Sequence, residues 1–200
     1  MATYVFSDVH GHAAPLARAI KKIAPAADDV FYCLGDMIDR GPDPLGVISI
    51  VRSLPNVHVL MGNHEDLMMA CMLEPEDELD AVNAANWGIN GGIVTSEALA
   101  GLSEDEADEI VGWVASLPRC AHVTVEERPY LLVHAGIDPS AVTVEGPWDD
   151  QKLDALLAEQ SPDDLLWIRE GFWGSHTGLV DAEGKGPIVI AGHTPTPYLD

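Results

Sequence analysis

The strongest constraint on the fold is a unit that recurs in the first 72 residues: an apolar run, a short polar loop with glycine, and a segment with helical spacing. The apolar runs are residues 4–6, 30–34 and 57–61, in which β-branched and aromatic residues are frequent. Such runs predict strands, and the segments that follow them predict helices. Successive units of this kind pair their strands in parallel, so we predict a layered α/β fold with central β-sheets flanked by helices.

Residues 75–118 show a different pattern, because acidic segments with helical spacing flank a loop at Trp87–Gly92. Ser103 and Glu106 have the S-x-x-E spacing of a capping box, which predicts the start of a helix. We therefore expect a single domain over residues 1–200, with a helical cap inserted at about residues 75–118.

The chain then returns to strand patterns. Residues 123–125 and 130–133 predict a hairpin, and residues 187–191 predict a last strand. The second hairpin strand ends at His134-Ala135-Gly136, and the last strand ends at Gly192-His193-Thr194.

The composition excludes several classes of protein. The chain has 33 acidic and 10 basic residues, a formal net charge of −23 and 47% hydrophobic residues, so it is acidic but apolar enough to fold. The negative charge repels phosphate backbones and anionic membranes, so we expect no nucleic-acid and no membrane partner. Three cysteines without a C-x-x-C pair, and an amino terminus without a basic leader, favour the cytoplasm. The oligomeric state stays open.

Polar side chains with metal-ligand chemistry follow each predicted core strand. The carboxyl ends of strands in an α/β sheet meet at one edge, which predicts that these side chains converge. Oxygen and imidazole donors together suit Mn, Fe or Zn, and six donors exceed what one tetrahedral ion needs. We therefore predict two divalent metal ions, manganese first and iron or zinc as alternatives, with Asp36 as the bridge. The predicted ligands are Asp8, His10, Asp36, Asn63, His134 and His193.

The ordered motifs carry a family resemblance. They are D-V-H-G at Asp8, G-D-M-I-D-R-G at Gly35, G-N-H-E at Gly62, H-A-G at His134 and G-H-T at Gly192. Together they resemble the calcineurin-like metallophosphoesterases, and within them the phosphoprotein phosphatase branch with its bacterial and phage members. Five motifs in order, spread from Asp8 to Thr194, make a specific signal.

The resemblance implies how the two ions are held. The first would be bound by Asp8, His10 and Asp36, and the second by Asp36, Asn63, His134 and His193. In that family, a water or hydroxide that bridges the metals attacks phosphorus in line, and no covalent phosphoenzyme forms.

The same resemblance implies the roles of the groups that contact the substrate. His64 would be the general acid that protonates the leaving oxygen, and Asp39 would orient it. Arg40 would bind the phosphate, with Arg169 as a second phosphate-binding arginine. Asn63 would contribute to substrate binding as well.

Two features bear on the substrate in opposite directions. The family often has arginine just before G-N-H-E, where this chain has Met61. Asp39 and Glu65, however, correspond to residues that the symmetrical diadenosine tetraphosphatases of the superfamily usually lack. These two residues favour the phosphoprotein branch, so a phosphorylated protein or a small phosphoester is the expected partner.

We therefore expect a phosphatase for phosphomonoesters, first of all phosphoserine or phosphothreonine on proteins, with phosphotyrosine as a further option. One alternative is a nucleotide or bis-nucleotide hydrolase of the diadenosine tetraphosphate type. A second alternative is a metal-binding interaction module without turnover. The loop Trp87–Gly92 resembles a W-x-x-N-G-G element of bacterial relatives, and either shapes the mouth of the site or forms a packed turn.

Overall fold

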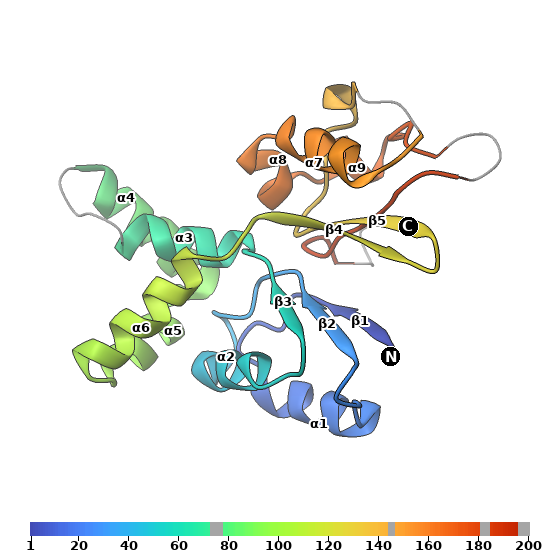
Figure 1. Ribbon diagram of the computed structural model, residues 1–200. Coiled ribbons are helices and arrows are strands. Elements are labelled where there is room, and N and C mark those ends of the chain that lie inside the picture. The colour runs from blue at the N-terminus through green and yellow to red at the C-terminus, as the bar shows by residue number, and fades with distance from the viewer. Residues whose placement is uncertain (73–77, 144–146, 181–184, 196–200) are drawn as a thin grey trace. The chain divides into compact units, whose positions relative to one another are not determined.

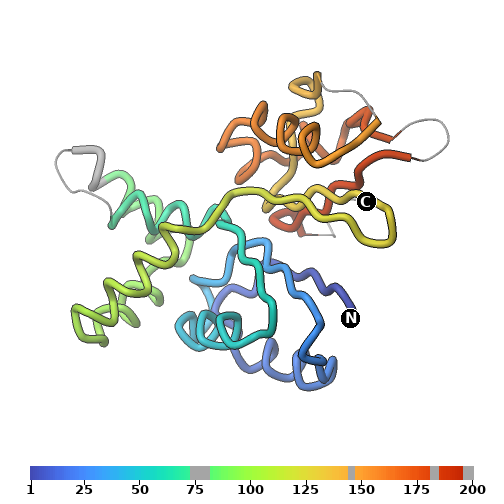
Figure 2. Tube along the Cα trace, in the orientation of Figure 1, coloured from blue at the N-terminus to red at the C-terminus, as the bar shows by residue number. Residues whose placement is uncertain are grey.

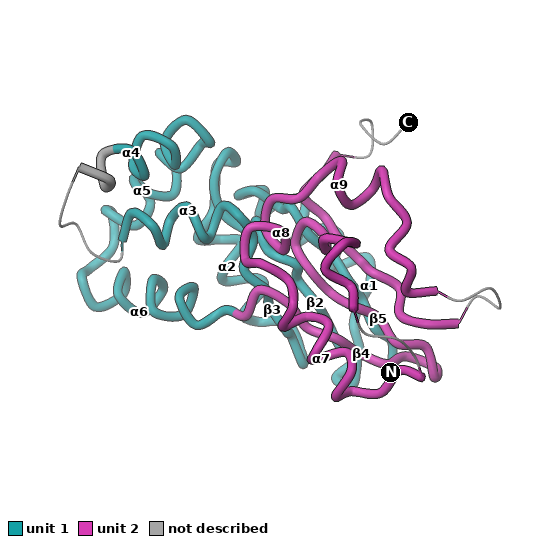
Figure 3. The backbone as a smooth tube through the Cα atoms, turned by 90° about the horizontal axis from the view of Figure 1, so that it is seen from above, with its two compact units in different colours: residues 1–117 teal, residues 118–200 magenta. Residues whose placement is uncertain are grey.

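The computed structural model describes residues 1–72, 78–143, 147–180 and 185–195 of the chain. These residues form two units, Met1–Leu117 and Pro118–Asp200 (Figure 3). Among the described residues, every helix is too short or too polar to cross a bilayer.

The first unit contains a parallel sheet with the strand order β1-β2-β3 (Figure 1). Strand β1 spans Thr3–Phe6, β2 spans Val30–Cys33 and β3 spans Val57–Val59. The parallel pairing confirms the prediction from the strand–loop–helix units, although β2 and β3 end one and two residues earlier than their apolar runs. The last residues of each run already belong to the polar turns.

A helix follows each of these strands, as the chain trace in Figure 2 shows. Apolar residues of these helices and of the sheet form one buried core, which includes Cys33, Val47, Val51 and Met68. The spacing of the apolar residues along each helix explains why one face packs against the sheet. The helices are α1 (Ala13–Ile23), α2 (Pro44–Arg52) and α3 (Asn63–Met72).

The rest of the first unit is helical. It comprises α4 (Glu78–Trp87), a π-helical turn η1 (Gly88–Gly92), α5 (Ile93–Ala100) and α6 (Glu104–Ala115). The predicted capping box is confirmed, because the backbone N–H of Ser103 donates to Glu106 Oε2 over 3.0 Å. Residues 75–77 of the expected cap lie outside the described residues, and its role as a cap stays a prediction.

The second unit contains a sheet with the strand order β4-β5-β6. Strands β4 (Cys120–Val125) and β5 (Arg128–Val133) are antiparallel, and β6 (Ile188–Ile190) runs parallel to β5. The predicted hairpin is confirmed, with a two-residue turn in which Glu126 and Glu127 both have positive φ angles, of 49° and 65°. That backbone matches the twist of the flanking strands.

Helices that the sequence patterns did not predict complete the second unit. Leu153, Leu156 and Leu157 of α7 are buried in its core together with residues of β5. These elements are η2 (Pro139–Ala141), α7 (Asp150–Ala158), α8 (Pro162–Trp167) and α9 (Glu170–Trp173).

Candidate active site

In the first unit, the predicted site residues lie where the parallel strands end. Asp8 and His10 follow β1, Asp36 follows β2, and Asn63 is the first residue of α3 after β3. Asn63 is buried and Asp8 is half-buried. The parallel sheet therefore brings these four residues to one edge, as the strand pattern predicted.

The backbone adopts the left-handed region at many of these positions, and by residue type the strain falls on His10, Arg40 and His193 rather than on the aspartates. Ten residues other than glycine have positive φ angles in the described part of the chain, and six of them are predicted site residues. A side chain in the left-handed region costs about 1–3 kcal/mol unless it is Asn, Asp or Gly, and such strain concentrates at functional sites. The six are Asp8, His10, Asp36, Asp39, Arg40 and His193.

Backbone hydrogen bonds join the turn after β1 to the turn after β2. The N–H of Asp8 donates to the Gly35 carbonyl over 3.2 Å, and the N–H of His10 donates to the Asp36 carbonyl over 2.9 Å. These backbone hydrogen bonds set the distance between His10 and Asp36 independently of their side chains.

Glu65 joins the turn after β2 to the turn after β3. Its carboxylate is fully buried and accepts the N–H groups of Asp36 and Met37, each over 2.8 Å, and of Gly62 over 2.9 Å. Burial raises the pKa of Glu65, while these N–H groups favour the carboxylate. From the sequence, Glu65 is only a marker of the phosphoprotein branch, whereas the structure shows that it holds the two turns together.

The repeating unit predicts a polar loop after the third apolar run, where the G-N-H-E segment stands. This prediction is wrong for most of the segment, because α3 already begins at Asn63. Asp36 Oδ1 accepts the N–H of His64 over 3.0 Å, which satisfies a donor of the first helical turn. Gly62 allows this approach, since a Cβ there would lie 2.3 Å from Asp36 Oδ1.

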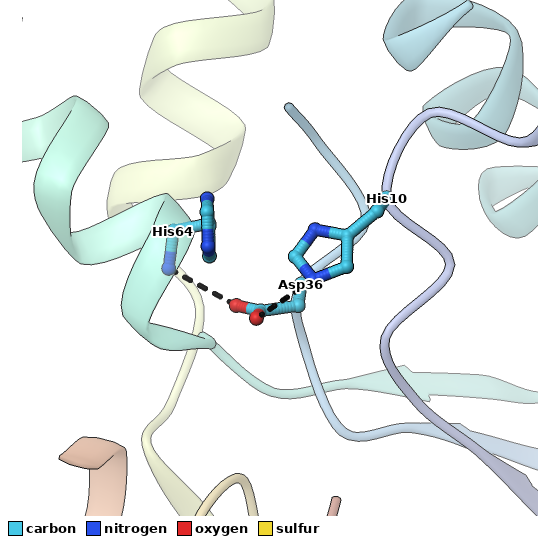
Figure 4. Close-up of side chains that lie close together, drawn as sticks. All are labelled: His10, Asp36 and His64. Carbon is cyan, nitrogen blue, oxygen red and sulfur yellow. Dashed lines mark hydrogen bonds and ion pairs between the residues drawn. The ribbon is translucent and has the colours of Figure 1, made fainter. Parts of the chain in front are cut away.

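His10 presents one imidazole nitrogen to Asp36. Its Nδ1 lies 3.0 Å from the Ile38 carbonyl, which can only accept, so Nδ1 carries the proton. The unprotonated Nε2 lies 3.4 Å from Asp36 Oδ2, and Figure 4 shows this contact beside the one from Asp36 to His64. Burial lowers the pKa of His10 to about 4, so the ring is neutral at pH 7.

Asp36 is a second buried carboxyl group with a raised pKa in this part of the structure. It is buried, and this burial, together with the nearby charge of Glu65, raises its pKa well above the usual range. The imidazole of His10 is neutral, and its other nitrogen is fixed by a carbonyl. It lies next to a carboxylate whose charge is costly to bury alone. This combination is typical of a site that binds a cation.

His64 is held from both sides of its ring. Its Nδ1 lies 2.7 Å from Asp39 Oδ2, so Nδ1 carries the proton and donates it. Its Nε2 accepts from Arg40 Nη2 over 2.8 Å, and Arg40 Nη1 lies 2.9 Å from His10 Nε2. Although potential ligand atoms of His10, Asp36 and His64 all lie within 4.8 Å of one another, both nitrogens of His64 already have partners.

Two residues outside the predicted site set contact Asp39. The Thr95 hydroxyl donates to Asp39 Oδ1 over 2.6 Å, and Trp87 Nε1 donates to Asp39 Oδ2 over 2.9 Å. The W-x-x-N-G-G element includes Trp87, for which the sequence left open whether the loop shapes the mouth of the site or forms a packed turn, and no sequence motif pointed to Thr95.

In the second unit, the predicted ligands His134 and His193 lie together. His134 follows β5 and His193 follows the neighbouring parallel strand β6, and both are buried. Their Nε2 and Nδ1 atoms are 3.2 Å apart, and the His134 carbonyl accepts the N–H of Gly192 over 2.8 Å. Arg169 lies directly before α9, and its side chain is exposed. Its role in phosphate binding stays a prediction.

Comparison with known proteins finds a family model that matches the whole chain and curated relatives that match most of it. The family model of the calcineurin-like phosphoesterases matches residues 1–200. A symmetrical bis(5'-nucleosyl)-tetraphosphatase of Proteus mirabilis strain HI4320 is 26% identical over 168 residues, which cover 80% of this chain and 54% of that protein. The corresponding protein of Erwinia tasmaniensis is 32% identical over 143 residues, 70% of this chain and 46% of that protein.

The chain thus spans about half the length of the curated relatives it matches. Among solved structures, a cold-active protein tyrosine phosphatase is similar with a TM-score of 0.52 and 19% identity, covering 96% of this chain and 66% of that one. At that identity, the likeness concerns the fold alone.

Proposed function

The chain belongs to the calcineurin-like phosphoesterase family, and on that basis we propose that its substrate is a dinucleoside polyphosphate, whose phosphoanhydride bridge it hydrolyses. The observation that carries the proposal is the similarity to symmetrical bis(5'-nucleosyl)-tetraphosphatases over 70–80% of the chain. The relatives therefore favour the bis-nucleotide hydrolase, which the sequence alone placed second, over the protein phosphatase, which it placed first. Met61, at a position where the family often has arginine, also favours the bis-nucleotide hydrolase.

The donor chemistry of the site fits divalent metal ions. His10 presents its unprotonated Nε2 toward Asp36. A cation bound there would lower the free-energy cost of burying the negative charge of Asp36. When bound, the ions would polarise the phosphoryl oxygens and activate the attacking water. We propose two ions, manganese first, with the ligands Asp8, His10, Asp36, Asn63, His134 and His193.

The chain's own residues supply phosphate binding and proton transfer. The guanidinium of Arg40 faces His10 and His64, so it is placed to bind a phosphoryl oxygen beside them. In a chain of net charge −23, such a local cation is needed to attract an anionic substrate. For His64 to act as the proton donor, Arg40 would turn from Nε2 to the phosphoryl group and Nε2 would take up a proton, which it then gives to the leaving oxygen while Asp39 holds Nδ1–H. Arg169 and Asn63 remain proposed substrate contacts.

A phosphorylated protein is the second candidate, and the pair Asp39–His64 favours it. A serine or threonine alkoxide is a far more basic leaving group than a nucleotide phosphate, and therefore needs a proton in the transition state. Asp39 Oδ2 accepts the Nδ1–H of this acid, while the other carboxylate oxygen, Oδ1, accepts from the Thr95 hydroxyl.

The test is a comparison of substrates with the manganese-loaded chain. Diadenosine tetraphosphate and a set of phosphoserine, phosphothreonine and phosphotyrosine peptides would be compared by kcat/KM, with nucleotide products separated by chromatography. Asp36→Asn serves as the control for contaminating phosphatases, because it removes the proposed bridging ligand.

We expect faster turnover of the dinucleotide. A higher kcat/KM for the phosphopeptides would overturn the proposed substrate in favour of the second candidate. Inactivity on both, with two metal ions bound per chain, would overturn the enzymatic proposal and leave a metal-binding interaction module.

A further inference from the structure

We propose that Trp87, Asn90, Gly91 and Thr95 are positioning residues for the catalytic groups: Trp87 and Thr95 fix the Asp39–His64 pair, and Asn90 and Gly91 fix Arg40. The inference rests on the proposed function, in that it takes His64 as the proton donor and Arg40 as the phosphate ligand. It gives the W-x-x-N-G-G element a role in positioning the catalytic groups, and it gives Thr95 the same role.

The contacts of Asp39 carry the first half of the proposal. Thr95 Oγ1 donates to Oδ1 over 2.6 Å, while Trp87 Nε1 over 2.9 Å and His64 Nδ1 over 2.7 Å share Oδ2. The Asp39 N–H in turn donates to Thr95 Oγ1 over 3.0 Å, so the hydroxyl is fixed at both ends. A carboxylate bound in this way cannot rotate without losing a partner.

Burial makes each of these bonds hard to replace. Asp39 is 0% exposed, Thr95 1% and Trp87 5%, so water has little access to a vacated position. A buried oxygen that loses its donor is left without a hydrogen bond, which is energetically unfavourable. Removing the Thr95 hydroxyl would therefore favour rotation of the Asp39 carboxylate toward another donor, away from the imidazole of His64.

The contacts of Arg40 carry the second half. Its backbone N–H donates to the Gly91 carbonyl over 3.2 Å, and its Nε donates to the Asn90 carbonyl over 3.4 Å. Gly91 has a φ of 102°, and a Cβ there would lie 2.8 Å from Arg40 Cγ. Only glycine fits this turn without moving the arginine, and π-helical turns of this kind are frequent at functional sites.

A role in proton donation can be separated from a role in stability alone. If Thr95 acts through His64, its loss should slow substrates with basic leaving groups far more than substrates whose leaving groups need no proton. If Thr95 only stabilises the fold, all substrates should slow by the same factor. The dependence of rate on the leaving group therefore decides between the two.

The first experiment compares Thr95→Val with Thr95→Ser in the manganese-loaded chain. Valine keeps the shape but removes the hydroxyl, whereas serine keeps the hydroxyl. For Thr95→Val, we expect kcat to fall about 10- to 100-fold on phenyl phosphate and no more than about 3-fold on 4-nitrophenyl phosphate, since general acid catalysis contributes about 10²- to 10⁴-fold. Thr95→Ser should restore most of the difference, and Thr124→Val, at an exposed threonine of β4, is the matched control.

Equal losses on both esters would overturn the role of Thr95. A second readout needs no turnover: the proton NMR signal of the short His64 Nδ1–H bond to Asp39 should be far downfield in the parent and in Thr95→Ser, and shifted or lost in Thr95→Val. An unchanged signal in Thr95→Val would refute the positioning role even if the chain hydrolyses no phosphate ester. Failure of the proposed function and failure of this inference are thereby distinguished.

The arginine half is tested by Gly91→Ala against Gly88→Ala, in the same turn. A Cβ at Gly88 would meet nothing within 4 Å, and its φ is not positive. We expect Gly91→Ala to weaken binding of inorganic phosphate about 10-fold, as the loss of one charge-assisted hydrogen bond predicts, while Gly88→Ala leaves it unchanged. Equal phosphate dissociation constants in the two variants, measured by calorimetry, would overturn the assignment of Gly91.

Discussion

Replacement of Glu65 by glutamine tests the conclusion that this carboxylate holds the turns after β2 and β3 together. The carboxylate is fully buried and accepts three short hydrogen bonds from the N–H groups of Asp36, Met37 and Gly62. Glutamine has nearly the same shape but only one acceptor oxygen. Whichever way the amide is placed, at least one of the three N–H groups then faces an NH₂ group.

The size of the effect follows from these contacts. The less costly placement keeps the oxygen at Oε2, for Asp36 and Gly62, and removes the acceptor of the short bond from the Met37 N–H and of the longer, 3.4 Å bond from the Ile38 N–H. Losing one charge-assisted bond costs about 1.5–3 kcal/mol, and the two remaining bonds weaken by about 0.5–1 kcal/mol each because the acceptor is neutral. Relief of the buried charge and of its repulsion with Asp36 offsets part of this sum, so we expect unfolding to become easier by about 2 kcal/mol.

The measurement has to report on the first unit, because the two units need not unfold together. Native-state hydrogen exchange of the Met37 amide does so directly, and urea unfolding followed by circular dichroism gives the global value. Glu97→Gln, at an exposed glutamate of α5, is the matched control and should stay within about 0.5 kcal/mol of the parent. If Glu65→Gln also stays within that limit and the Met37 amide keeps its protection, the bracing role is wrong.

Three further predictions concern metal binding and ionisation. Asp36→Asn should bind fewer than two manganese ions per chain, and undiminished two-metal stoichiometry in mass spectrometry of the native protein would refute the bridge. In the metal-free chain, the His10 ring should stay neutral down to about pH 5, because burial lowers its pKa to about 4; an NMR midpoint near the ordinary 6.5 would contradict this. Asp29 accepts the N–H groups of Ala2 and Ala26, which lower its pKa, so the stability that it contributes is present above about pH 4 and lost on further acidification. The difference in unfolding free energy between parent and Asp29→Ala should therefore shrink from pH 7 to pH 3, and a constant difference would exclude a contribution from the charge.

The parts of the fold that follow from local patterns could be predicted from the sequence. The parallel sheet followed from three apolar runs, each joined to a helix by a short glycine-containing turn, and the hairpin of β4 and β5 from two runs separated by a short polar stretch. Helix α7 could have been found by the same logic, since Leu153, Leu156 and Leu157 have helical spacing and Asp149 caps the helix. Its neighbours α8 and α9 are too short for periodicity to identify.

The missing parts of the candidate site depend on contacts between distant residues. Thr95 lies 56 positions from Asp39, and its hydroxyl matters only because the turn η1 brings it there. Glu65 reaches 28 and 29 positions back to Met37 and Asp36, so its neighbours in the sequence say nothing of its partners. A motif identifies a residue that performs chemistry, whereas the residue that holds it in place can stand anywhere in the chain.

The two candidate substrates differ in what they require of His64, and this difference connects the proposals. A nucleotide leaving group is stable as an anion, so hydrolysis of a dinucleoside polyphosphate needs little help from a proton donor, whereas an alkoxide needs it greatly. A buried carboxylate with three donors is costly to keep and is not needed to bind the ions, because Asp39 contacts His64, Trp87 and Thr95 instead. If Thr95→Val slows phenyl phosphate but leaves diadenosine tetraphosphate untouched, the network serves phosphomonoesters, whatever the relatives hydrolyse. If Thr95→Val slows hydrolysis of the dinucleotide as strongly, protonation of the bridge oxygen limits that reaction too. The hydrogen bonds around Asp39 then serve polyphosphate cleavage.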